Sequence, residues 1–301
     1  MSAGRWPVVA TLTPADPRVV TSSAAALAAN TAPELTENDF RRVAELTKQV
    51  AGINLQRGKE GLVRARLTRR LRALGLASFD DYLTLVAREP SRVELKEMVD
   101  ALTTNKTSFF REPQHFDYLR RTLLPALAAA KVGPRIWSAG CSSGEEPVTL
   151  AIVLQECLPE QLLRRSRILA TDISARVLDR ARDASYPAEQ LAELPRDVVR
   201  RNFVPAPGGA TWQVVEPLRR MIHFARLNLM GDWPMQGPFD AVFCRNVMIY
   251  FDKPTQGRLV ARFWDMLAPG GHLFVGHSES LTGLDHRFRY VQPAVYVKDE
   301  A

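Results

Sequence analysis

Three short segments carry polar residues at positions where a protein of alternating strands and helices would bind a ligand. In WSAGCSSGEEP, residues 137–147, small residues join an apolar run to a helical pattern and let the backbone approach a ligand closely. In ATDIS, Asp172 follows a second apolar run, where an acid can bond ribose hydroxyls. In FCRNVMIYF, Arg245 and Asn246 interrupt a third run. Because ligands lie at the carboxyl ends of such strands, we expect one shared site.

Each segment also has a plainer structural explanation. The first can be an ordinary strand–helix turn, Asp172 can cap the next helix (as Ser174 also can), and the third can be a surface loop. The first segment is not GxGxxG and lacks the lysine of a P-loop, and Glu145 and Glu146 would oppose a phosphate. A ligand that is cationic or neutral at this end is favoured. The sulfonium and α-amino groups of S-adenosylmethionine (SAM) fit that requirement.

The elements that hold these segments follow from hydrophobic periodicity. Residues 1–33 are rich in Ala, Thr, Ser and Pro and are expected to form a flexible tail without a signal peptide. Residues 34–102 predict four helices, the first capped by Thr36 and the second, the basic one, ending at Gly75. Residues 103–301 alternate strands and helices, which predicts a parallel sheet covered on both faces. Two strand-like pieces, Trp212–Val215 and Met221–Phe224, predict a β-insert over about residues 203–224, and a Pro-Gly-Gly turn should close the helix before residue 272.

Composition narrows the class of protein. The chain has 301 residues, 46% of them hydrophobic, and no apolar run approaches the roughly 20 residues of a membrane span. Three cysteines and five histidines without zinc-site spacing predict a reduced, cytoplasmic protein without a metal site. The net charge of +7 favours an acidic partner, whether nucleic acid, anionic lipid or protein.

With one further segment, TNKTSFFRE at residues 104–112, the chain resembles the CheR-type chemotaxis receptor (protein-glutamate) O-methyltransferases. The resemblance covers roughly residues 35–298 and rests on six motifs in the family's order, which also include LNL, FDAVFCRNVMIYFD and LAPGGHLFVGHSESL. It implies an N-terminal all-α subdomain, then a class I (Rossmann-like) SAM-methyltransferase domain with a small inserted antiparallel β-subdomain. The implied reaction forms γ-glutamyl methyl esters on chemoreceptors, with S-adenosyl-L-homocysteine as product.

The resemblance also implies roles for individual residues. Arg111 would orient the substrate carboxylate, Tyr250 would lie near the reacting methyl group, and Glu146, rather than Glu145, would lie near the methionine end of the cofactor. Phe109 and Phe110 would pack their segment against the core. The residues implied to contact SAM are Asn105, Thr107, Arg111, Glu146, Asp172 (ribose), Asn228 and Leu229 (adenine), Arg245 and Asn246.

The second predicted helix is strongly basic. One side is apolar, formed by Leu62, Val63, Leu67, Leu71 and Leu74. The usual explanation of a charge run is a solvated face, but only Glu60 opposes six bases here. In the family a helix at this place faces the acidic methylation region of the receptor, so the implied substrate-binding residues are Arg64, Arg66, Arg69 and Arg72. The short turn APGGA in the insert favours binding without a receptor C-terminal pentapeptide.

Other functions remain open from the residues alone. The basic charge would suit a nucleic-acid methyltransferase, yet the chain has neither a [DN]-P-P-[YF] motif nor a Pro-Cys nucleophile. A SAM-binding regulator without turnover would share the same pocket motifs, and an NAD-linked oxidoreductase is disfavoured by the missing GxGxxG. The expected partner is the cytoplasmic domain of methyl-accepting receptors, with recruitment to receptor arrays at the inner membrane, no nucleic acid and no membrane insertion.

Overall fold

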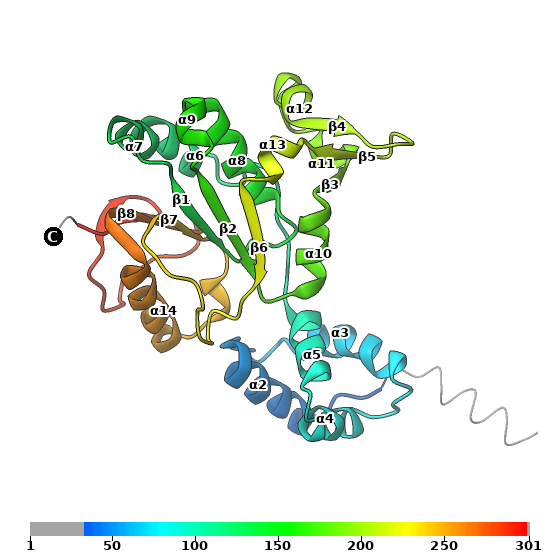
Figure 1. Ribbon diagram of the computed structural model, residues 1–301. Coiled ribbons are helices and arrows are strands. Elements are labelled where there is room, and N and C mark those ends of the chain that lie inside the picture. Colours follow the sequence, from blue (N-terminus) through cyan, green and yellow to red (C-terminus); the bar gives the residue numbers. More distant parts are fainter. Residues whose placement is uncertain (1–32, 300–301) are drawn as a thin grey trace, which may run out of the picture.

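The computed structural model describes residues 33–299, and the predicted tail lies outside this range apart from its last residue. Figure 1 shows a small group of helices, coloured blue to cyan, beside a larger α/β domain. The helices are α2 (Glu37–Ala51), α3 (Glu60–Ala73), α4 (Phe79–Arg88) and α5 (Val93–Leu102), as the periodicity predicts. They enclose a core of their own, in which Val63, Leu67 and Tyr82 are fully buried.

The ends of these helices follow local rules. Thr36 caps α2 with a reciprocal capping box, because its hydroxyl accepts from the Asp39 N–H and the Asp39 carboxylate accepts from the Thr36 N–H. Gly75 follows α3 in the left-handed conformation, which glycine adopts without strain. Two predicted apolar positions of α3 are wrong, since Leu62 and Leu74 are 37% and 39% exposed. The buried stripe is narrower because Val63, Leu67 and Leu71, spaced by four residues, already fill the contact with the neighbouring helices.

A seven-stranded sheet forms the centre of the larger domain, in the order β6-β2-β1-β7-β8-β10-β9. Its parallel part comprises β6 (Ile222–Arg226), β2 (Arg167–Asp172), β1 (Arg135–Ala139), β7 (Phe239–Cys244) and β8 (Leu267–Val275). The last two strands, β10 (Val295–Val297) and β9 (Arg289–Gln292), pair antiparallel at one edge. The sheet is therefore mostly parallel, as predicted.

Helices cover both faces of this sheet. On one face α8 (Glu145–Cys157) packs with α6 (Gln114–Tyr118), η1 (Leu119–Leu123) and α7 (Leu124–Ala129); the short α9 (Glu160–Leu163) follows α8. On the other face α14 (Lys253–Met266) packs against the sheet. Along β1 the buried side chains alternate, with Ile136 in the first core and Trp137 in the second. α10 (Ala175–Asp183) connects β2 to the inserted sheet.

The small antiparallel sheet is confirmed, but its predicted limits are wrong. It has the order β3-β5-β4, formed by β3 (Ser185–Pro187), β5 (Thr211–Val214) and β4 (Phe203–Pro205), with α11 (Ala188–Leu191) and α12 (Arg196–Asn202) between β3 and β4. The predicted strand around Met221–Phe224 is instead β6, which follows α13 (Glu216–Arg219) and pairs in parallel with β2 of the main sheet. A three-residue strand such as β3 carries too little periodicity to be recognised, and the partner of β6 lies some 50 residues away in sequence.

The predicted Pro-Gly-Gly turn after α14 is also wrong. These residues lie inside β8, where Gly270 N–H donates to the Lys298 carbonyl at 2.8 Å and Lys298 N–H donates to the Gly271 carbonyl at 2.9 Å. The pairing of β7 with β8 shifts register here, and Gly270 has a φ of 73°. Glycine therefore serves a bulge in a strand rather than a turn. No helix within residues 33–299 is both long and apolar enough to cross a membrane.

Candidate active site

A cavity of about 280 Å³ lies at the carboxyl ends of β1, β2 and β7. This is the edge at which α/β sheets bind ligands. The structure brings together at this cavity all ten residues predicted for the cofactor and the reaction: Asn105, Thr107, Arg111, Glu146, Asp172, Asn228, Leu229, Arg245, Asn246 and Tyr250. Glu145 is not among the lining residues; its carboxylate accepts from the Ser143 hydroxyl.

Asp172 is fixed at the end of β2 by two backbone amides. Its Oδ2 accepts from Ser142 N–H at 2.9 Å and its Oδ1 from Ser174 N–H at 3.0 Å, while Ser174 itself caps α10. Burial raises the pKa of this carboxyl, against the opposing effect of the two N–H groups. Each oxygen keeps a further lone pair for a ligand hydroxyl. The plainer explanation of Asp172 as a helix cap is therefore wrong, because Ser174 does that work.

The helical domain forms one wall of the cavity, which the sequence did not reveal. Ala51, Ile53 and Leu102 line it. The Asn228 side-chain amide donates to the Val50 carbonyl at 2.6 Å, and Asn54 N–H donates to the Tyr250 carbonyl at 2.8 Å. Backbone contacts of this kind leave no residue-type signal. The helical domain thus holds two of the predicted site residues in place.

The segment 104–112 runs over the cavity and is fastened on both sides. Phe109 is buried edge-on between the rings of Tyr186 and Phe203, at centroid distances of 4.9 and 5.5 Å. Phe110 N–H donates to the Thr149 hydroxyl at 3.2 Å. Phe110 and Glu112 both have positive φ, so the backbone is tightly turned around Arg111. This turn directs the Arg111 guanidinium to the cavity, where its recorded partner is the Lys106 carbonyl at 2.9 Å.

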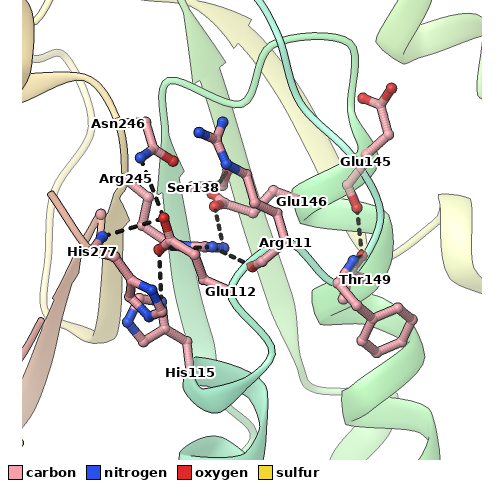
Figure 2. A network of polar contacts seen from close by, with 12 residues as sticks. Arg111, Glu112, His115, Ser138, Glu145, Glu146, Thr149, Arg245, Asn246 and His277 are labelled. Atoms are coloured by element: carbon pink, nitrogen blue, oxygen red, sulfur yellow. Dashed lines mark hydrogen bonds and ion pairs between the residues drawn. The ribbon is translucent and has the colours of Figure 1, made fainter. Parts of the chain in front are cut away.

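Arg245 is a buried cation held between two carboxylates. Only 2% of its side chain is exposed, and its guanidinium contacts Glu112 at 3.1 Å, Glu146 at 3.0 Å and the Arg111 carbonyl. Figure 2 shows that Arg111 joins this network through its backbone while its guanidinium points away. Glu146 also accepts from the Ser138 hydroxyl at 2.7 Å. Arg245 therefore ties the segment 104–112 to β1 and α8.

The two carboxylates respond differently to this shared partner. Burial works to raise the pKa of Glu112, but Arg245 and the N–H of His277 outweigh it and the pKa is lowered. Burial raises the pKa of Glu146, because Arg245 and Ser138 oppose it only in part and the charge of Glu112 adds to it. Glu112 is thus firmly ionised at neutral pH, and Glu146 relies on Arg245 to remain so.

Glu112, His115 and His277 form a group that sequence spacing did not predict, with ligand atoms within 4.8 Å of one another. His115 is fully buried, and burial lowers its pKa to about 3. The Glu112 oxygens already accept from two nitrogens of the Arg245 guanidinium, from the Asn246 side-chain amide and from the N–H of His277. Four donors saturate a carboxylate and an adjacent guanidinium repels a cation, so the geometry is that of an ion-pair network.

The four arginines predicted for substrate binding lie on α3, away from the cavity lining. Arg64, Arg69 and Arg72 are exposed, and within residues 33–299 no ion pair involves them. Arg66 differs, because its guanidinium donates to the Leu102 and Thr103 carbonyls at 2.6 and 2.9 Å. It fastens α3 to the start of the segment over the cavity.

The donor set of the cavity fits SAM. Asp172 offers acceptors for a ribose, Leu229, Ile173 and Phe251 give an apolar wall, and Glu146 supplies negative charge at the other end. A mostly parallel sheet with this site at its carboxyl edge defines a SAM-dependent methyltransferase of class I.

The comparisons with known proteins identify the family. Residues 38–103 match the family described as "CheR methyltransferase, all-alpha domain", and residues 105–297 match "CheR methyltransferase, SAM binding domain". The chain belongs to the CheR methyltransferase family, and SAM is its cofactor.

Three relatives illustrate the similarity. The chain is 44% identical over 268 residues to "Chemotaxis protein methyltransferase 2" of Pseudomonas aeruginosa, covering 87% of this chain and 93% of that protein. It is 41% identical over 266 residues to "Chemotaxis protein methyltransferase" of Escherichia coli K12, covering 87% and 91%. The protein of the same name from Borreliella burgdorferi is 37% identical over 272 residues, covering 88% and 95%.

Proposed function

We propose that this protein methylates glutamate side chains in the cytoplasmic domain of methyl-accepting chemoreceptors, forming γ-glutamyl methyl esters. The relatives are named chemotaxis protein methyltransferases, which supports a chemosensory substrate. The observation that carries the choice of acceptor is the Arg111 guanidinium, which lines the cavity and, among the described residues 33–299, donates only to the Lys106 carbonyl. A guanidinium with free donors suits a carboxylate.

The chemistry asks for placement more than for acid–base catalysis. A glutamate carboxylate is already a nucleophile at neutral pH, so no strong general base is needed. When bound, SAM supplies an electrophilic methyl group on a sulfonium. Arg111 orients the incoming carboxylate, and the segment 104–112 excludes water from the reacting atoms. Tyr250 lies on the cavity wall, where its ring would attract the cationic sulfonium of bound SAM.

The remaining residues bind the cofactor. Asp172 accepts from the ribose hydroxyls, Asn228 and Leu229 bound the adenine, and Glu146 lies toward the methionine end. Asn105, Thr107 and Asn246 complete the polar wall. Arg245 supports the site indirectly, because its guanidinium forms ion pairs with the carboxylates of Glu112 and Glu146.

The exposed face of α3 is the proposed receptor-docking surface. Arg64, Arg69 and Arg72 give it three cations that have no acidic partner at ion-pair distance within the part of the chain that the structure describes, and an acidic receptor segment complements such a face. Arg66 contributes by fixing the helix rather than by direct contact. In this proposal the enzyme works in the cytoplasm at receptor arrays and needs no pentapeptide tether.

The test is methyl transfer from radiolabelled SAM to membranes that contain the host's chemoreceptors, followed by alkali treatment and capture of volatile methanol. Carboxyl esters hydrolyse in alkali, whereas methylated amines and bases do not. Volatile label that disappears with Arg111→Ala would support the proposal. Stable label on nucleic acid, or SAM binding without transfer to any host receptor, would overturn it in favour of a nucleic-acid methyltransferase or a non-catalytic regulator.

A further inference from the structure

Glu279 belongs to the motif GHSES, residues 276–280, whose His277 N–H donates to Glu112 in the site described above but whose Glu279 has no role there. It follows β8 and does not line the cavity. Its carboxylate is buried, with 7% of the residue exposed. A buried carboxylate costs stability unless its oxygens are well partnered, so its partners show what it does.

Those partners are backbone amides from two different loops. Oε2 accepts from Asn246 N–H at 2.8 Å and from Gly276 N–H at 2.5 Å, and Oε1 accepts from Ile249 N–H at 3.1 Å. One carboxylate therefore spans the loop after β8 and the turn after β7. Three N–H donors to one ionised group are charge-assisted and strong.

The turn that Glu279 holds is the one that carries the predicted site residues. Asn246 has a φ of 59°, in the left-handed region that few non-glycine residues adopt, asparagine more often than most. Residues Met248–Tyr250 then form a single 3₁₀ turn, η2, and both Ile249 and Tyr250 line the cavity. Met248 is buried in the core, but Ile249 is 50% exposed, so packing alone does not fix the position of Ile249.

The space around Gly276 agrees with this arrangement. A β-carbon there would lie 2.8 Å from both the Asn246 nitrogen and the Glu279 Oε2, and 2.5 Å from the Asn246 side-chain nitrogen. The two loops can approach closely enough to share one carboxylate only because residue 276 has no side chain.

We propose that Glu279 is a positioning residue, whose buried carboxylate holds the Asn246–Tyr250 turn so that Tyr250 and Ile249 face the reacting methyl group and the substrate. The proposal rests on the proposed function for the role of Tyr250. Glu279 itself touches neither cofactor nor substrate.

The substitution Glu279→Gln tests this selectively. An amide has one acceptor oxygen, and the orientation that keeps more bonds directs it at Asn246 and Gly276, leaving an NH₂ group against Ile249 N–H. We expect affinity for SAM, measured by calorimetry, to change less than about threefold, while the single-turnover rate of methyl transfer at saturating SAM falls about tenfold or more. Glu279→Asp keeps the charge but shortens the reach, and it should separate rate from affinity in the same way.

Two further measurements distinguish positioning from plain stability. Hydrogen exchange should accelerate in peptides spanning residues 245–252 in both variants, which can be measured even if receptor methylation itself fails. In a Tyr250→Leu background, which lacks the aromatic ring, Glu279→Gln should slow transfer much less than in the wild type. The matched control is Asp240→Asn, which removes a carboxylate that accepts from Arg135 N–H at the opposite end of the sheet and should leave the rate per folded enzyme unchanged.

Unchanged exchange in residues 245–252 together with wild-type transfer rates would overturn the proposal. So would rate losses from Glu279→Gln and Tyr250→Leu that multiply independently, or an equal rate loss in the Asp240→Asn control. If the wild type methylates no receptor but exchange at 245–252 still accelerates, the proposed function fails and the turn-holding role of Glu279 stands.

Discussion

Replacing Arg245 by methionine would leave two carboxylates, Glu112 and Glu146, facing each other inside the protein. The arginine is the shared partner of both, at 3.1 and 3.0 Å, and only 2% of its side chain reaches solvent. Methionine has a similar length and fills the space without supplying charge or donors. The substitution thus isolates the electrostatic contribution of Arg245 to folding.

The expected loss is about 3–5 kcal/mol of unfolding free energy at pH 8, the usual cost of removing one partner from a buried ion pair. Without Arg245 the folded-state pKa of Glu112 rises above the unfolded value, and that of Glu146, which burial already raises, rises further. A carboxyl group with a raised pKa is most favourable to folding below its unfolded pKa, and that advantage is lost as pH rises through the folded pKa. In the wild type the pKa of Glu112 is lowered, so its contribution is present above the unfolded pKa and is lost as pH falls. The difference in unfolding free energy between the wild type and the variant should therefore be smaller near pH 5. It should grow toward pH 8, as Glu112 and Glu146 lose their protons in the folded variant.

Urea unfolding followed by tryptophan fluorescence is the assay. Residues 34–102 contain no tryptophan, whereas Trp137 and Trp233 pack together in the core of the larger domain, so the signal reports that domain. The control adds Glu112→Gln and Glu146→Gln to Arg245→Met, which should restore much of the stability and remove the pH dependence. The reasoning is refuted if the single variant shows the same deficit at pH 5 and pH 8, or if the triple variant is no more stable.

Three other substitutions test the site more directly. Arg111→Ala should lower receptor methylation about 100-fold with an unchanged circular dichroism spectrum, because among residues 33–299 its side chain donates only to a backbone carbonyl; equal turnover would remove it from the mechanism. Arg69→Glu with Arg72→Glu should raise the KM for receptor at low salt, an effect that fades as salt rises, whereas the exposed control Arg121→Glu on the opposite domain should not. Gly140→Ala should weaken SAM binding at least about tenfold in calorimetry, because the residue has a φ of 97° and a β-carbon would lie 2.4 Å from a valine methyl; unaltered affinity would show that the turn can relax.

The parts of the fold that the sequence predicted are those governed by local rules. The Thr36 cap, the four helices of the first domain and the short apolar strand β1 are all set by residues within a few positions of one another. Ligand residues were found because strand ends in α/β sheets converge, which brings Asp172 and Arg245 to one edge. The predictions were wrong where a strand pairs with a strand distant in the sequence, as β6 does, or where a strand is very short, as β3 is.

The buried charges of the site could not be predicted for a related reason. Arg245 is 133 residues from Glu112 and 99 from Glu146, and Glu279 lies 33 residues beyond Asn246. Nothing in the sequence distinguishes these glutamates from solvated ones. Only Glu146 was expected at the site, and through a resemblance. The carboxylates that hold the site are therefore known from the structure alone.

The ion pairs that Arg245 forms with Glu112 and Glu146 help to decide which cation of the cavity would bind the carboxylate of the proposed substrate. The described lining of the cavity includes Lys106, Arg111 and Arg245. Arg245 is neutralised by two carboxylates and its donors are used, so a third carboxylate would gain little from it and would be repelled by its partners. Arg111 has the opposite character, because its backbone carbonyl is held by Arg245 while its guanidinium keeps free donors. The buried ion pairs thus fix the backbone of the arginine that remains available, which favours Arg111 over Arg245 as the group that orients the substrate.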